Sequence, residues 1–238
     1  MISRPFAVFD IDGTLVRWQL YHAVADTLAK RGYIDESTYQ AIRDARMSWK
    51  KRTSPESFKD YERQLVRAYE AILAHLSVEQ FEMAAQLVFD EYKDQVYTYT
   101  RDLIRSLKKN GYLLFAISNS QTEIVEKIAS YWGFDDYIGA NYEQRGGHFT
   151  GKRKAYLHDK DLALTKLVHK HNASWENSIA AGDSTSDIPM LRLVNQPIAF
   201  NPEKKLFDEA KKQRWKIVVE RKNVVYILKS DGQSYKLG

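Results

Sequence analysis

The clearest pattern in the chain is a short apolar run near its start that ends in two carboxylates. Residues Phe6–Phe9 are apolar, Asp10 follows them directly, and Asp12 and Gly13 come next. A short, continuous apolar run bounded by a turn signal predicts a strand buried on both faces, as in a parallel sheet. Aspartate and glycine are poor strand residues, so we expect the strand to end near Asp10 and Gly13 to allow a tight turn.

Residues 17–99 show apolar side chains at helical spacing throughout, and no glycine-rich or proline-rich linker separates them from their flanks. The pattern predicts four helices. The expected helix signals are an end at Gly32, a start at Ser54-Pro55 and a capping box of Ser77 with Gln80. We therefore expect a helical insertion after the first strand.

Beyond residue 100, helical and strand patterns alternate, which predicts a parallel sheet with right-handed crossovers. Further helices are expected from Thr100, from a capping box of Ser120 with Glu123, and from Asp159-Lys160. Further strands are expected at 112–117, 178–182, 197–200 and 216–219, with a small hairpin or flap at 146–151 and a C-terminal hairpin of Val224–Leu228 and Ser234–Leu237.

Polar side chains stand where each of the first three buried strands is expected to end. Asp10 and Asp12 follow the first strand, Ser118 the second, and Asp183 with Asp187 the third. The carboxyl ends of parallel strands lie at one edge of the sheet, so these side chains can converge there. Two carboxylates two residues apart repel each other unless a proton or cation intervenes, which favours a divalent metal ion.

Taken in order, four segments resemble the four motifs of the haloacid dehalogenase-like (HAD) phosphohydrolases: Asp10-x-Asp12-Gly-Thr, Ile117-Ser118, Lys160, and Gly182-Asp183-Ser-Thr-Ser-Asp187. The resemblance implies an α/β fold with a Rossmann-like parallel-sheet core domain (1–16 and 100–238), a helical C1-type cap domain (17–99) and a C-terminal β-hairpin. Two further segments, 147–151 and 199–203, resemble the phosphoserine-phosphatase-like branch, subfamily IB.

The resemblance also implies roles for the carboxylates. Asp10 would attack phosphorus and form an aspartyl phosphate, and Asp12 would protonate the leaving alcohol and then activate water. Mg²⁺ would be held by the Asp10 carboxylate, the Asp12 backbone carbonyl and Asp183, with Asp187 supporting that shell.

Phosphate binding is assigned by the same resemblance to Ser118, Asn119 and Lys160, of which Lys160 also offsets negative charge on Asp10. Ser118 has a plainer alternative as a strand-end hydroxyl, and Ser120 is interpreted only as a helix cap. Lys160 is chosen over Lys152, Lys154 and Lys166 because it begins its helix and lies 23 residues before Asp183, as in this family branch.

Composition narrows the function only slightly. The 238 residues include 36 basic and 31 acidic side chains, a net charge of +5, which gives no reason to expect nucleic acid. The absence of cysteine excludes disulfides and thiol catalysis. No signal-peptide pattern and no apolar run of about 18 residues occurs, so we expect a soluble, cytoplasmic protein without a membrane partner. The pattern does not specify an oligomeric state.

The predicted function is Mg²⁺-dependent hydrolysis of a small phosphorylated metabolite. A phosphotransferase and a catalytically idle phosphate-binding module stay open as alternatives, whereas a dehalogenase is disfavoured because halide leaves without a proton. Bacterial and archaeal phosphoserine phosphatases carry a glutamate nine residues after the nucleophile, facing the substrate amino group, and the same offset here is Gln19. We therefore expect phosphoserine not to be the preferred substrate, unless Asp26 or Glu62 supplies the missing charge.

Overall fold

The computed structural model describes residues 3–54, 56–153, 159–230 and 235–237. The chain divides into two compact units. The first, called the core unit, comprises Met1–Gln19, Glu91–Ala140 and Tyr156–Gly238, and the second, called the helical unit, comprises Leu20–Asp90 and Asn141–Ala155. Three residues named in the sequence interpretation lie outside the described residues: Pro55, Lys154 and Ser234.

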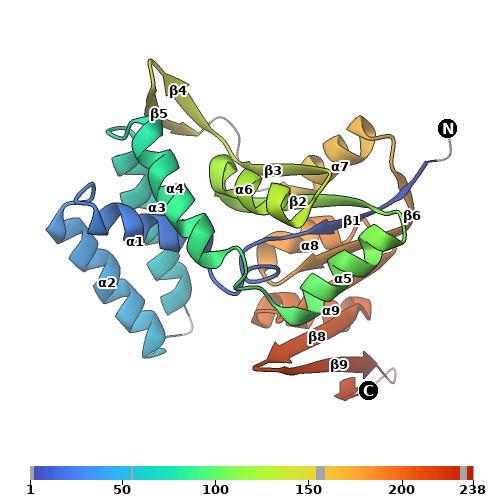
Figure 1. Cartoon of the computed structure of the whole chain (residues 1–238). Coiled ribbons are helices and arrows are strands. Elements are labelled where there is room, and N and C mark those ends of the chain that lie inside the picture. Colours follow the sequence, from blue (N-terminus) through green and yellow to red (C-terminus); the bar gives the residue numbers. More distant parts are fainter. Residues whose placement is uncertain (1–2, 55, 154–158, 231–234, 238) are drawn as a thin grey trace. The chain divides into compact units, whose positions relative to one another are not determined.

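A sheet of eight strands forms the centre of the core unit (Figure 1). Its order is β10-β9-β8-β7-β6-β1-β2-β3. The six strands β8, β7, β6, β1, β2 and β3 are parallel, β9 pairs antiparallel with β8, and β10 pairs antiparallel with β9. The strands are β1 (Pro5–Phe9), β2 (Leu113–Gln121), β3 (Asp136–Ala140), β6 (Ser174–Gly182), β7 (Gln196–Phe200), β8 (Lys216–Arg221), β9 (Val224–Ser230) and β10 (Tyr235–Leu237). The expected α/β class and C-terminal hairpin are confirmed.

The first strand lies in the middle of this sheet. It pairs with β2 on one side, where Phe9 is opposite Ala116, and with β6 on the other, where Phe9 is opposite Ala181. Consecutive residues Phe6–Phe9 are fully buried, so both faces of β1 are covered. The chain builds outward from β1 to β3 and then crosses back to β6, which makes the boundary between β1 and β6 the topological switch point of the sheet.

Helices pack against this sheet: α5 and α6 against β2, α7 against β2 and β3, α8 against β6 and β7, and α9 against β7 and β8. Their bounds are α5 (Thr98–Lys109), α6 (Thr122–Trp132), α7 (Lys160–Lys170), α8 (Ile188–Leu191) and α9 (Lys204–Gln213), with a short 3₁₀ turn η1 (Thr185–Asp187) before α8. None of the helices in the described ranges is long and apolar enough to cross a membrane.

The helical unit contains the four expected helices and a two-stranded hairpin: α1 (Leu20–Lys30), α2 (Glu36–Lys50), α3 (Ser57–Leu73), α4 (Val78–Tyr92), β4 (Tyr142–Arg145) and β5 (His148–Arg153). The capping box before α4 is confirmed, because the Ser77 hydroxyl accepts from the Gln80 N–H and the Gln80 amide oxygen accepts from the Ser77 N–H. The hairpin lies within the 100–238 segment that was expected to belong to the core.

Long-range contacts explain why the hairpin groups with the helices. The Val78 N–H donates to the Gly147 carbonyl at 2.9 Å, and the Phe149 N–H donates to the Leu76 carbonyl at 3.1 Å. The Phe149 ring is fully enclosed and meets the edge of Phe81 at 5.4 Å between centroids. These main-chain bonds and this aromatic pair hold the hairpin against the turn between α3 and α4.

Two expected helix starts were wrong. The second predicted strand continues as β2 through Gln121, so Ser120 is a strand residue and makes no capping box with Glu123. Helix α5 begins at Thr98 rather than Thr100. The strand β3 was missed, because its half-exposed sequence at the sheet edge lacks a buried apolar run.

Candidate active site

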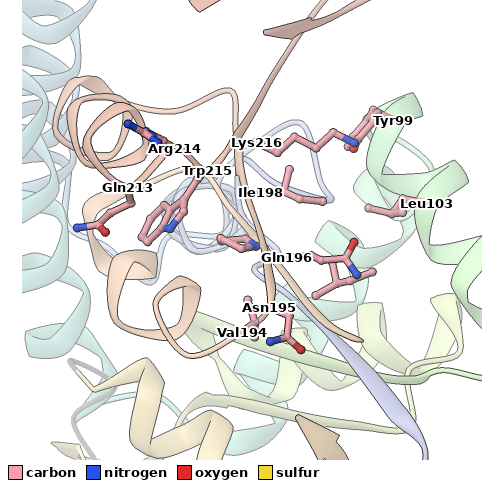
Figure 2. A pocket seen from close by; sticks show the side chains of 12 residues that line it. Tyr99, Leu103, Val194, Asn195, Gln196, Ile198, Gln213, Arg214, Trp215 and Lys216 are labelled. Carbon is pink, nitrogen blue, oxygen red and sulfur yellow. The ribbon is translucent and has the colours of Figure 1, made fainter. Parts of the chain in front are cut away.

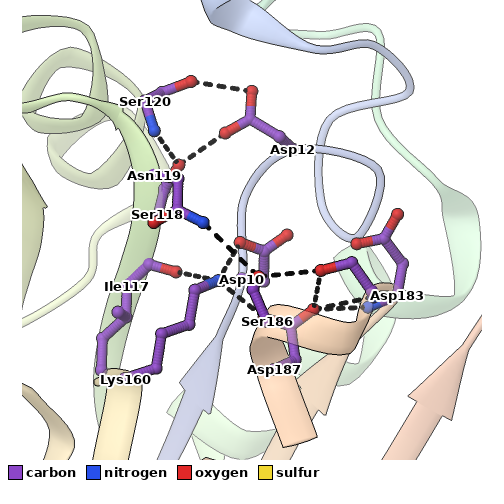
Figure 3. Close-up of polar contacts among 11 residues, drawn as sticks. Asp10, Asp12, Ile117, Ser118, Asn119, Ser120, Lys160, Asp183, Ser186 and Asp187 are labelled. Carbon is purple, nitrogen blue, oxygen red and sulfur yellow. Dashed lines mark hydrogen bonds and ion pairs between the residues drawn. The ribbon is translucent and has the colours of Figure 1, made fainter. Parts of the chain in front are cut away.

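The predicted site residues gather at the carboxyl ends of β1 and β6, at the topological switch point of the sheet (Figure 3). Asp10 follows β1 directly, and its N–H donates to the Ala181 carbonyl of β6 at 3.0 Å. Asp183 is the first residue after β6. The parallel pairing of β1 with β6 therefore places the two carboxylates side by side although 173 residues separate them in sequence.

A buried lysine connects two of these carboxylates. Lys160 is the first residue of α7, and its Nζ donates to Asp10 Oδ1 at 2.7 Å and to Asp187 Oδ1 at 2.6 Å. It also donates to the Ile117 carbonyl of β2 at 3.3 Å. Lys160 is 1% exposed and Asp187 is 0% exposed, so this ion-pair triad lies out of contact with solvent.

Asp187 is fixed by hydrogen bonds to both of its carboxylate oxygens. Oδ1 accepts from Lys160, while Oδ2 accepts from the N–H groups of Asp183 and Ser184 at 3.0 and 2.9 Å and from the Ser184 hydroxyl. A β-carbon on Gly182 would lie 2.4 Å from Asp187 Cβ, so only glycine permits this close approach. Asp187 thus anchors the loop that carries Asp183.

Asp12 is held by two hydroxyl groups of β2. Ser118 Oγ donates to Asp12 Oδ2 at 2.5 Å, and Ser120 Oγ donates to Asp12 Oδ1 at 3.0 Å. Side chains alternate along a strand, so Ser118 and Ser120 face the same side and Asn119 faces the other. Asn119 is exposed, and its amide nitrogen donates to the Ser186 hydroxyl at 3.4 Å.

The turn after β1 depends on a glycine. Gly13 has φ of +80°, a conformation that glycine adopts without strain, and its N–H donates to the Val16 carbonyl at 3.0 Å. A β-carbon at this position would lie 2.2 Å from Asp183 Oδ2. Gly13 therefore lets the first acidic segment approach the Asp183 carboxylate closely.

The site gathers several buried carboxyl groups, and their ionised forms are disfavoured unless positive charge lies nearby. Burial, together with the nearby Asp187 and Asp12 charges, raises the pKa of Asp10 to about 8, against the lowering effect of Lys160. Burial and the charges of Asp10 and Asp187 also raise the pKa of Asp183 well above its usual range. The pKa of Lys160 is raised: burial acts against its charge, but the attraction of Asp10 and Asp187 outweighs it.

The donor set suits a small divalent cation. Carboxylate oxygens of Asp10, Asp183 and Asp187 all lie within 4.8 Å of one another. Carboxylates that crowd together out of water are stabilised by a cation, and oxygen ligands are those that Mg²⁺ prefers. Because both oxygens of Asp187 already accept hydrogen bonds, the residues fit Mg²⁺ best with Asp10 and Asp183 as its carboxylate ligands.

The structure shows which of the candidate lysines contacts the site. Lys160 joins the site, whereas Lys152 on β5 and Lys166 on α7 are exposed, and Lys154 lies outside the described residues. The role of Ser120 was missed. A longer second strand would have revealed it, because alternation along such a strand places residues 118 and 120 on one face.

A pocket of about 520 Å³ lies elsewhere on the core unit (Figure 2). Its lining includes the first residues of β7 and β8, Gln196 and Lys216, so it lies toward the amino ends of those strands. Tyr99, Arg214 and Trp215 also line it. None of the predicted site residues lines this pocket, so it is separate from the carboxylate cluster.

Comparison with known proteins identifies the family of the chain. The family model described as haloacid dehalogenase-like hydrolase matches residues 7–192. A histidinol-phosphatase of Neisseria meningitidis serogroup C (strain 8013) is 25% identical over 229 residues, which cover 90% of this chain and 98% of that protein. A phosphoserine phosphatase of Lactococcus lactis subsp. lactis (strain IL1403) is 27% identical over 204 residues, which cover 84% and 85% of the two chains.

Solved structures share the fold. A protein of unknown function from Bordetella pertussis Tohama I superposes with a TM-score of 0.73 at 21% identity, covering 91% of this chain and 98% of that one. A phosphoserine phosphatase, solved as a phospho-aspartyl intermediate analogue, gives a TM-score of 0.64 at 20% identity and covers 93% and 96%. The family match spans the segments that carry the site, and the chain belongs to the haloacid dehalogenase-like hydrolases.

Proposed function

We propose that the protein is a Mg²⁺-dependent phosphatase that hydrolyses a small phosphomonoester through an aspartyl phosphate on Asp10. The observation that carries this proposal is the Lys160 ammonium buried between Asp10 and Asp187, together with a third aspartate, Asp12, that is held by two hydroxyl groups. A phosphomonoester is a dianion with a poor leaving group, so its hydrolysis requires charge neutralisation, a nucleophile and a proton donor. The core unit offers a candidate for each task.

Asp10 is the proposed nucleophile. Its carboxylate extends from the end of β1, and the 2.7 Å bond from Lys160 fixes Oδ1 and keeps a positive charge beside it. Lys160 favours the ionised form of Asp10, which is the form that attacks phosphorus. The same ammonium offsets the negative charge that the phosphoryl group brings to the site.

Asp12 is the proposed acid and base. It would protonate the leaving alcohol oxygen during the first step and take a proton from the hydrolytic water during the second. Ser118, with Asn119 and neighbouring backbone N–H groups, would bind the phosphoryl oxygens. Ser118 is well placed for this task because it lies next to Asp12, to which its hydroxyl donates at 2.5 Å.

The metal centre proposed here uses the Asp10 carboxylate, the Asp12 backbone carbonyl and Asp183, with Asp187 orienting the Asp183 segment. When bound, Mg²⁺ would neutralise negative charge on the phosphoryl oxygens and on the carboxylates that surround them. Asp183 is also bonded to the loop between β7 and α9, since its carbonyl accepts from the Glu203 N–H at 2.9 Å.

The substrate is proposed to be a small phosphorylated metabolite other than phosphoserine. The relatives named above act on different compounds by name, phosphoserine in one case and histidinol phosphate in the other, so the family match leaves the substrate open. Gln19 offers no charge to a substrate ammonium, and a charge-assisted hydrogen bond is about twice as strong as a neutral one.

Asp26 of the helical unit is another candidate source of negative charge for a substrate ammonium, and its contacts argue against that role. Arg46 makes two 2.8 Å bonds to the Asp26 carboxylate and donates from Nε to the Tyr61 hydroxyl at 2.9 Å. The Asp26 charge is therefore already compensated within its own unit, where Arg46 holds both carboxylate oxygens. Asp26 is a poor candidate for a counter-charge to a substrate amino group.

The test is release of inorganic phosphate from 4-nitrophenyl phosphate and from a panel of alkyl phosphates, with Mg²⁺ and with EDTA. Asp10→Asn keeps the side-chain shape but removes the nucleophile, so kcat should fall by about 10³-fold or more. Addition of alcohols at increasing concentration distinguishes hydrolysis from phosphoryl transfer. Wild-type protein without Mg²⁺-dependent turnover of any phosphate, or Asp10→Asn protein with substantial turnover, would contradict the proposal.

A further inference from the structure

The Asp12 carboxylate has one hydroxyl group on each of its oxygens. Ser118 Oγ donates to Oδ2 at 2.5 Å and Ser120 Oγ donates to Oδ1 at 3.0 Å (Figure 3). Both serines are almost completely buried, at 0% and 1% exposure, and β2 presents them on the same face. The two hydroxyl groups thus donate to different oxygens of the Asp12 carboxylate, and neither can replace the other.

The Ser118 hydroxyl cannot donate to Asp12 and to a phosphoryl oxygen at the same time. A serine hydroxyl has one proton to donate. In the structure Ser118 gives that proton to Asp12 and accepts the Ser120 N–H at 2.9 Å. If Ser118 binds a phosphoryl oxygen, which rests on the proposed function, its proton turns toward that oxygen and Asp12 Oδ2 is released.

We infer that Ser120 is the positioning residue of Asp12 and holds its carboxyl group through Oδ1 once Ser118 has turned to the phosphoryl group. Because Oδ1 accepts the Ser120 hydrogen bond, the acidic proton of Asp12 is carried by Oδ2. That oxygen is the one beside Ser118, and so the one beside the bound phosphoryl group. The Ser120 hydrogen bond therefore fixes the orientation of the Asp12 carboxyl group and determines which of its oxygens carries the proton.

The two chemical steps then use the same oxygen. In the first, Asp10 forms a bond to phosphorus, the bond from phosphorus to the leaving oxygen breaks, and that oxygen keeps the electron pair and takes the proton from Asp12 Oδ2. In the second, water attacks phosphorus and gives its proton to Oδ2 while the bond from phosphorus to Asp10 breaks. Asp12 ends protonated, as it began.

The test compares first-turnover rates of Ser120→Ala and wild-type protein, measured by rapid quench in the presence of Mg²⁺. With an alkyl phosphate such as glycerol phosphate, whose leaving oxygen needs a proton, the rate should fall by about 10- to 100-fold. With 4-nitrophenyl phosphate, whose leaving group needs little protonation, it should fall by less than about threefold. Inhibition by inorganic phosphate should be unchanged, because Ser118 keeps its hydroxyl.

Two further variants separate positioning from packing. Ser120→Thr retains the hydroxyl and should restore the alkyl-to-aryl rate ratio. Ser178→Ala removes an equally buried serine of β6, whose Oγ accepts from the Asn195 N–H at 3.1 Å, and should leave that ratio unchanged. The ratio is taken within one preparation, so partial unfolding lowers both rates together and does not imitate the effect.

An unchanged alkyl-to-aryl ratio in Ser120→Ala would overturn the inference, and so would a folded Ser120→Thr protein that is as slow on the alkyl phosphate as Ser120→Ala. A ratio that shifts equally in Ser178→Ala would show that any buried change in the sheet produces it, which also overturns the assignment. Failure of the proposed function would look different, because wild-type protein would then turn over neither substrate.

Discussion

Replacement of Lys160 by methionine tests the electrostatic core of the site. Lys160→Met keeps a side chain of similar length and apolar volume but removes the ammonium that binds Asp10 and Asp187 at 2.7 and 2.6 Å. All three side chains are almost completely buried. The variant therefore leaves two carboxylates out of water and without the cation that compensates them.

The structure sets the size of the effect. Removal of one partner from a buried ion pair costs about 3–5 kcal/mol of unfolding free energy, because the remaining charge keeps its desolvation penalty. For a chain of this length, 1 kcal/mol corresponds to about 2–4 °C in the unfolding midpoint, so the midpoint should fall by roughly 6–20 °C. Loss of a charge that stabilises the reacting phosphoryl group should also lower kcat by about 10²- to 10³-fold.

The assay follows thermal unfolding at pH 7.5 in EDTA and hydrolysis of 4-nitrophenyl phosphate with Mg²⁺. Lys166→Met is the matched control, because Lys166 lies on the same helix with its side chain exposed. The control should keep wild-type stability and turnover. A Lys160→Met protein as stable and active as wild type, or a Lys166→Met protein that loses as much, would refute the reasoning.

Three further predictions follow from other parts of the core unit. Glu220→Ala removes the carboxylate that accepts the Thr98 and Tyr99 N–H groups, so the unfolding free energy should fall by about 1–3 kcal/mol while kcat changes little. Denaturant unfolding measures this loss, and a variant as stable as wild type would contradict the prediction. The folded-state pKa of Asp10, about 8, lies above its ordinary value of 3.8, so in EDTA its contribution to stability should be lost as pH rises from about 4 to 8. Thermal unfolding should show this fall between pH 5 and 8, with a larger Mg²⁺ stabilisation at pH 8, and an Asp10→Asn protein with the same pH slope would argue against it. Because Gln19 is neutral, phosphoserine should not exceed glycerol phosphate in kcat/KM, and a tenfold preference for phosphoserine would disprove the Gln19 argument.

The sequence by itself determined the parallel sheet and the edge at which its carboxylates gather. The run Phe6–Phe9 is short, has no polar position and is followed by a turn signal, which favours a strand covered on both faces, and Asp10 then stands at the end of that strand. The same logic applies to the strand before Asp183. Both patterns are local. Because strands and helices alternate along the chain, the strands run parallel and their carboxyl ends lie at one edge of the sheet.

Only the tertiary structure decided which side chains contact one another there. The bond from Lys160 to Asp10 joins residues 150 positions apart, and those from Ser118 and Ser120 to Asp12 span 106 and 108 positions. A capping pattern at Ser120 gave a plausible local interpretation that was wrong. The side chain instead bonds to Asp12, because β2 continues far enough to present it there.

The start of α5 shows the same limit. The N–H groups of its first two residues, Thr98 and Tyr99, donate to the Glu220 carboxylate, which lies 122 and 121 positions further along the chain. The neighbouring N-cap residue contributes no side-chain hydrogen bond to this helix start. The β4–β5 hairpin likewise joins the helical unit through backbone bonds to Val78 and Leu76. Local sequence predicted most of the elements, whereas the full length of β2 and the partners of element ends and hydroxyls depend on segments that meet only after the chain has folded.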